Sequence, residues 1–73
     1  MRGNEFIKRI QRLAKKKGIE CRVEQWRGKG SHVTLYYGPR RTTVRNPRDE
    51  LKTGTFHAML AQLGITLNDF QEG

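Results

Sequence analysis

The stretch Lys29-Gly30-Ser31-His32-Val33-Thr34-Leu35-Tyr36-Tyr37 marks the point where a polar turn becomes a strand. Its second part alternates, with Val33, Leu35 and Tyr37 on one side and His32, Thr34 and Tyr36 on the other. This period of two predicts a half-buried strand over residues 32–37. Gly38-Pro39 predicts a turn, and polar and apolar side chains alternate again over residues 40–46, a strand that Asn46-Pro47 ends. The short connection predicts an antiparallel hairpin.

A further strand and a helix precede this hairpin. Residues 19–26 alternate between apolar and polar side chains, which predicts another half-buried strand. Apolar residues recur at helical spacing over residues 4–17: Phe6, Ile7, Ile10, Leu13 and Ala14. Asn4 suits the N-cap, and Gly18 suits the position just after the helix. The lysines at 15–17 complement the helix dipole, and they can also bind phosphates.

A second helix follows the hairpin. Its apolar positions have the spacing i, i+3, i+4, i+7: Phe56, Met59, Leu60 and Leu63. Thr53 or Thr55 can cap its start, and Gly64 ends it. Ile65 is expected to pack after this end, and Thr66 to open a last short helical turn through Phe70. Met59 belongs to the apolar stripe and is expected in the core.

The order helix, three strands, helix predicts one α+β domain over residues 1–73. Short connections make the sheet antiparallel, and two apolar helix faces need cover, so both helices are expected on one face of the sheet. The opposite face then remains open. It is predicted to present Arg22, Trp26, His32, Thr34, Tyr36, Arg41, Thr43 and Arg45.

Charge is the strongest feature of the composition. Fifteen Lys and Arg residues oppose seven Asp and Glu residues, for a net charge of +8 over 73 residues. All the basic residues lie between Arg2 and Lys52, and the last twenty-one residues carry only Asp69 and Glu72. So strong an excess of positive charge indicates a partner with a phosphate backbone.

Several classes of protein are disfavoured. The single cysteine, Cys21, cannot form an internal disulfide, and with only two histidines a zinc site of standard spacing is not available. No apolar run approaches the ~20 residues that span a bilayer, and the beginning of the chain lacks the apolar segment of a secretory signal. We therefore expect a cytoplasmic protein with Cys21 as a small core residue.

A ribonuclease that uses no metal needs one group to take the proton of the 2′-hydroxyl and another to protonate the leaving oxygen. Histidine suits this work, and the chain has two, His32 and His57. His32 is predicted on the basic face of the sheet. His57 lies on the flank of the second helix, where we interpret it as a solvated surface residue. No acidic cluster suitable for a two-metal nuclease is present.

The aromatic residue Trp26 has two interpretations. Beside basic residues, an exposed tryptophan can stack on a nucleobase. More often such a residue covers the edge of a sheet, which is the interpretation we favour for its packing. Trp26 is also a candidate RNA contact, because it alternates in step with Arg22 and is therefore expected on the open face.

The chain resembles the HicA (YcfA-like) toxin family of type II toxin–antitoxin systems. The likeness rests on Gly30-Ser31-His32 at the start of a strand, Asn46-Pro47-Arg48-Asp49-Glu50-Leu51 before the second helix, and the helix end Met59-Leu60-Ala61-Gln62-Leu63-Gly64-Ile65. It implies a fold like a double-stranded-RNA-binding domain, α-β-β-β-α. It also implies cleavage of mRNA with His32 as the essential histidine, and a HicB antitoxin that suppresses cleavage and itself binds operator DNA.

Two positions differ from many family members. Val33 stands where they have a second histidine, and Asn46 precedes Pro47 where they have His-Pro. If either histidine is the second proton carrier, this chain lacks it. His32 then works with another group, or the activity is low. The groups left open are Lys29, Arg41, Arg45, Tyr36 and water.

The sequence therefore predicts a ribonuclease toxin without metal or other cofactor. His32 is its candidate general acid or base. The candidate RNA contacts are Lys29, Tyr36, Arg41, Arg45, Arg22 and Trp26. The competing hypothesis is a module that binds RNA or its antitoxin without catalysis, and it rests on the shortage of proton carriers.

Overall fold

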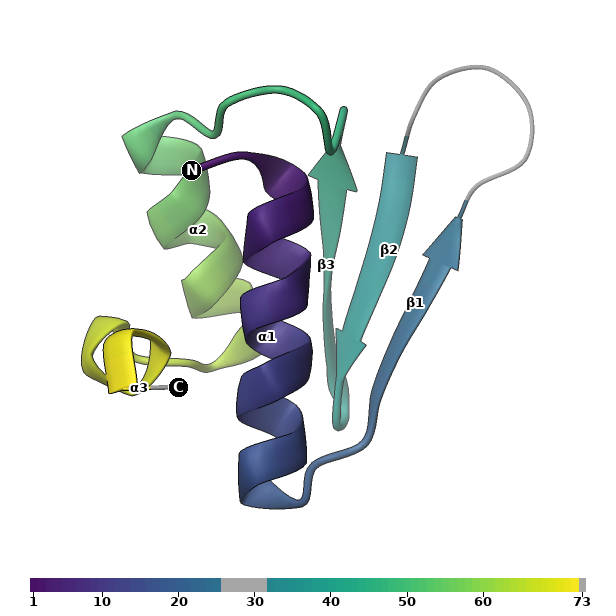
Figure 1. The fold of residues 1–73 in the computed structure, drawn as a ribbon, viewed down its shortest axis with the longest axis vertical. Helices are drawn as coiled ribbons and strands as arrows, with labels where there is room; N and C mark the ends of the chain where they lie inside the picture. The colour runs from purple at the N-terminus through teal and green to yellow at the C-terminus, as the bar shows by residue number, and fades with distance from the viewer. Residues whose placement is uncertain (26–31, 73) are drawn as a thin grey trace.

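A computed structural model describes residues 1–25 and 32–72 of the chain. Figure 1 shows two layers, with helices covering one side of a sheet. The elements are α1 (Gly3–Lys17), β1 (Cys21–Gln25), β2 (His32–Tyr37), β3 (Arg40–Arg45), α2 (Thr53–Leu63) and α3 (Leu67–Glu72). This order confirms the predicted α-β-β-β-α fold, and the expected last helical turn is the short helix α3.

The three strands form one antiparallel sheet in the order β1-β2-β3. β2 has the predicted bounds, but β1 begins at Cys21 instead of residue 19. The backbone N–H of Ile19 donates to the carbonyl of Ala14 at 2.8 Å, so Ile19 closes the end of α1 instead of entering the strand. β3 ends one residue before Asn46, whose φ of 46° turns the chain away from the sheet.

Helices α1 and α2 pack on the same face of the sheet, as predicted (Figure 1). The core between the layers contains the apolar stripes of both helices and the inward residues of β2 and β3. Its fully buried side chains are Phe6, Ile10, Leu13, Leu35, Val44 and Leu63. Met59 and Ile65 are also buried, as expected.

Two titratable side chains belong to this core. Cys21 is half-buried against it, and burial raises the pKa of its thiol. Tyr37 is buried on the inward face of β2, and burial raises the pKa of its phenol. Both groups therefore favour their neutral forms, which agrees with a packing role for Cys21.

The predicted side-chain caps of the two long helices were wrong. The N-cap of α1 is Arg2 instead of Asn4, and the N-cap of α2 is Lys52 instead of Thr53 or Thr55; neither makes a side-chain capping bond. At α1 the loop after β3 supplies the acceptors. The N–H of Gly3 donates to the carbonyl of Asp49 at 3.2 Å, and that of Asn4 to the carbonyl of Pro47 at 2.8 Å.

The helix ends follow the prediction. Gly18 and Gly64 adopt the left-handed conformation, with φ of 69° and 71°. At the start of α3 the Thr66 hydroxyl accepts a bond from the N–H of Asp69 at 3.0 Å. These signals depend on neighbouring residues only, which is why the sequence shows them.

Helix α3 completes the core. Phe70 is buried between Phe6 and Phe56, with ring centroids 5.6 Å and 5.1 Å away. The guanidinium of Arg9 lies 4.4 Å from the centre of the Phe70 ring. Phe70 is therefore one of the contacts that anchor α3 on α1.

Gly3 is the tightest junction between α1 and the loop after β3. A Cβ atom at this residue would lie 2.8 Å from the Cα of Pro47 and 2.9 Å from Cγ1 of Val44. We expect Gly3→Ala to lower the free energy of unfolding by about 1–3 kcal/mol, because the backbone must shift to make room. Urea denaturation measures this loss.

Gly54 provides the matched control. It lies in the first turn of α2, and no atom lies within 4 Å of the Cβ position. Gly54→Ala should raise the stability by about 0.4–1 kcal/mol, since alanine is the better helix former. A Gly3→Ala protein as stable as the wild type would show that this junction is not tight.

Candidate nucleic-acid interface

The strand register brings the predicted open-face residues together in rows. His32 pairs with Arg45, Thr34 pairs with Glu24 and Thr43, and Tyr36 pairs with Arg22 and Arg41. Because side chains alternate along each strand, these residues share the face turned away from α1 and α2. The structure thus groups seven of the eight predicted open-face residues: Arg22, His32, Thr34, Tyr36, Arg41, Thr43 and Arg45.

His32 is the first residue of β2 and is half-buried. Its Nδ1 atom is shielded from solvent. Arg45 is its cross-strand partner on β3. Directly opposed residues of antiparallel strands have Cβ atoms ~5 Å apart. The Cβ atom of Arg45 therefore lies next to that of His32.

At the other end of the face, Arg22 and Tyr36 form a stacked pair. The guanidinium of Arg22 lies 4.6 Å from the centre of the Tyr36 ring, and it also contacts Oε1 of Glu24 at 3.4 Å. Arg22 therefore covers one side of the tyrosine ring and is partly neutralised. Arg22 remains exposed, and the assignment of both residues as RNA contacts stays a prediction.

Glu24 also lies on this face, as its parity with Arg22 predicts, although the list of predicted open-face residues did not include it. The carboxylate lowers the positive charge of the β1 side. Within the described residues, the positive charge of the face is therefore concentrated on β3.

Arg41 and Arg45 are exposed on β3. Within residues 1–25 and 32–72, neither side chain makes an ion pair or a hydrogen bond. Thr34 fills the centre of the face and is only 8% exposed. The face therefore has a threonine at its centre and two exposed arginines along the β3 side.

Two predicted RNA contacts lie outside the described residues. These are Lys29 and Trp26, in the segment 26–31 that separates β1 from His32 in the sequence. Both stay predictions from the sequence.

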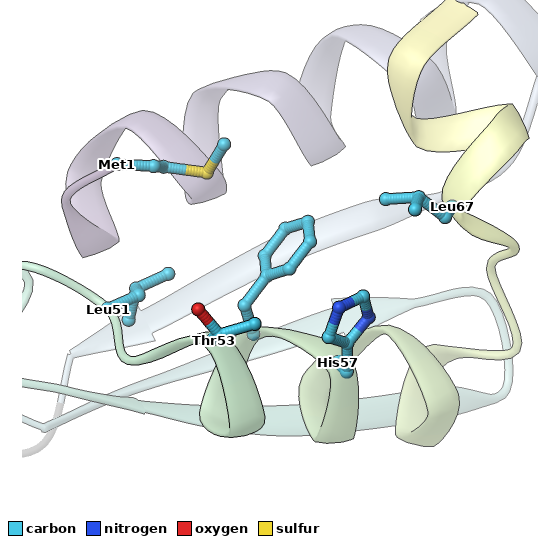
Figure 2. A pocket seen from close by; sticks show the side chains of 6 residues that line it. Met1, Leu51, Thr53, His57 and Leu67 are labelled. Carbon is cyan, nitrogen blue, oxygen red and sulfur yellow. The ribbon is translucent and has the colours of Figure 1, made fainter.

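The second histidine is not part of this face. His57 is exposed on α2, and its ring lies 5.3 Å from that of Phe56. It lines a cavity of about 270 Å³ together with Met1, Leu51, Thr53, Phe56 and Leu67. Figure 2 shows the labelled side chains of this cavity on the helical side of the protein. His32 and His57 thus belong to opposite layers and cannot act on one bond.

Residues 1–25 and 32–72 contain no group of three or more His, Cys, Asp or Glu side chains placed to hold a metal ion. Among the helices in these residues, none has the length and apolar character needed to cross a membrane.

The two free arginines should be replaceable without loss of stability. Arg41→Gln and Arg45→Gln each remove an exposed charge without a partner in the described structure, so we expect changes within about 0.5 kcal/mol. Leu35→Ala, on the buried face of β2, should cost about 2–5 kcal/mol. Thermal or urea unfolding tests this, and a large loss in either arginine variant would mean that the side chain holds the sheet together.

Comparison with known proteins identifies the family. The family model for the HicA toxin of bacterial toxin–antitoxin systems matches residues 7–65, which include β2, the hairpin and α2. Comparison with curated proteins and with solved structures gave no match. The family match covers most of the 73 residues and confirms the resemblance carried by the Gly-Ser-His element and the end of the second helix. The chain belongs to the HicA toxin family.

Proposed function

We propose that the protein is the toxin of a type II toxin–antitoxin system and acts as a metal-independent endoribonuclease on mRNA. The observation that carries the proposal is the pairing of His32 with Arg45 on an open sheet face. This pair supplies one proton-transfer group and one cation, and cleavage of a phosphodiester needs a second proton carrier besides them. Family membership supplies the toxin role.

In this proposal the RNA lies across the open face of the sheet. Arg41 and Arg45 bind phosphates, and His32 exchanges a proton with the RNA through Nε2, because Nδ1 is shielded. The 2′-hydroxyl loses its proton and its oxygen attacks the adjacent phosphorus. The bond from phosphorus to the 5′-oxygen breaks, and that oxygen takes up a proton. Arg45 offsets the negative charge that develops on the phosphate oxygens.

Several candidates for the second proton carrier do not fit this proposal. Tyr36 lies four residues along β2 from His32, or roughly 13 Å at the usual rise per residue, which is too far for the same phosphate. An arginine guanidinium keeps its proton in proteins, so Arg41 and Arg45 are unsuited to the task. His57 lies in the other layer. This leaves Lys29 and water as the candidates.

The proposed partners follow from the family and from the charge. A HicB-like antitoxin would cover the open face and prevent RNA from binding. DNA would be contacted only through that antitoxin. Since the substrate is mRNA, the toxin would act in the cytoplasm.

His32 is tested with purified protein, free of antitoxin, and single-stranded RNA in the presence of EDTA. The wild type should cleave. His32→Ala and His32→Asn should lose about 10²–10⁴-fold in rate, the usual contribution of a general acid or base. His57→Ala is the matched control and should keep wild-type activity, because His57 is exposed in the other layer.

Three results would count against the proposal. Equal cleavage by His32→Ala and the wild type would remove His32 from the chemistry. Cleavage that requires a divalent metal would contradict the proposed mechanism. RNA binding by the wild type without any cleavage would favour the competing hypothesis, a module that acts by binding alone.

A further inference from the structure

Most of the positive charge of the described structure lies away from the candidate site. Helix α1 carries six basic residues and one acidic residue, Glu5. The basic residues are Lys8, Arg9, Arg12, Lys15, Lys16 and Lys17. The open sheet face has three arginines in its described part, and one of them contacts Glu24. The proposed cleavage site therefore leaves the largest group of cations without a role.

Three of the six basic residues of α1 have structural partners. Arg9 stacks on Phe70. Lys17 pairs with Asp69 at 3.3 Å, and the Nζ atom of Lys16 donates to the carbonyl of Glu72 at 3.3 Å. These contacts hold α3 on α1, so they explain half of the positive charge of the helix.

The other three, Lys8, Arg12 and Lys15, are exposed, and within the described residues they make no ion pair or hydrogen bond. Their spacing, i, i+4, i+7, places them in one row along the helix. At 1.5 Å of rise per residue the row is roughly 10 Å long. It lies opposite the buried stripe of Phe6 and Ile10. Like charges at this spacing destabilise a helix. The row therefore does not contribute to the stability of α1.

The composition of this helix face indicates the kind of partner. Every exposed residue of α1 is polar or charged, and no aromatic or apolar side chain is exposed among them. Protein interfaces need aromatic or apolar anchors, and lysine is depleted in them. A row of lysine and arginine with long, flexible stems suits the phosphates of a nucleic acid, where contacts carry no sequence information.

We propose that Lys8, Arg12 and Lys15 form a second RNA-binding surface, which holds the phosphate backbone on the helical layer. This deepens the proposed function and rests on it for the choice of RNA. The sheet face does the chemistry, and α1 supplies affinity that does not depend on base sequence. RNA long enough to pass from one layer to the other binds through both surfaces.

The test measures binding of a 2′-O-methyl RNA of about 20 nucleotides, which lacks the hydroxyl needed for cleavage, at several salt concentrations. The triple variant Lys8→Gln, Arg12→Gln, Lys15→Gln is compared with Arg40→Gln, Arg48→Gln, Lys52→Gln. The control removes the same charge from exposed residues outside both surfaces. Circular dichroism confirms that both variants are folded.

The α1 variant should bind on the order of 10–100-fold more weakly at 0.1 M salt, and the slope of log affinity against log salt should fall by about 2, since each contact to a single strand contributes ~0.7. The control should keep most of the wild-type slope. Equal slopes in the two variants would overturn the proposal.

A cleavage assay distinguishes failure of this proposal from failure of the proposed cleavage activity. Unmodified RNA at saturating concentration should be cut by the α1 variant at the wild-type rate, with only the KM raised. Suppose that the wild-type protein binds RNA with the expected salt dependence but does not cut it. That result would refute the proposed cleavage and would still support the RNA-binding surface on α1. An α1 variant that binds RNA normally but loses affinity for polyglutamate would overturn the proposal in favour of an acidic protein partner.

Discussion

The pairing of β2 with both of its neighbours is the constraint on which the rest of the structure depends. Its backbone bonds to β1 on one side and to β3 on the other, so its register fixes which residues of all three strands share a face. A shift of one residue would move Leu35 out of the core and His32 into it. The apolar residues that stabilise the fold therefore also hold His32 beside Arg45.

The segment after β3 connects this register to the helical layer. Asn46 directly follows Arg45 and turns the chain, and Pro47 and Asp49 then accept the first N–H groups of α1. Gly3 allows the close approach that these bonds need. In this way the start of the helix with the free basic row is tied to the strand that carries Arg45. The two surfaces proposed to bind RNA are connected through this junction.

The sequence predicted the features that neighbouring residues determine. The bounds of β2 follow from strict alternation, and the ends of α1 and α2 follow from glycines in the left-handed conformation. The start of α1 was missed because its hydrogen-bond acceptors come from a loop more than forty residues away. The contact of Arg22 with both Tyr36 and Glu24 was missed for a related reason, since it depends on strand pairing as well as parity. Lys29 and Trp26 lie outside the described residues and stay predictions.

In the proposed mechanism the RNA supplies its own nucleophile and His32 moves the proton. The most direct measurement uses an RNA that the protein cuts at one mapped bond, and a second RNA in which only the nucleotide before that bond is 2′-deoxy. In EDTA we expect no cleavage of the deoxy substrate at that bond, and a 2′,3′-cyclic phosphate on the product of the normal one. Cleavage of both substrates at the same rate would contradict this mechanism, because the 2′-oxygen could not then be the attacking group.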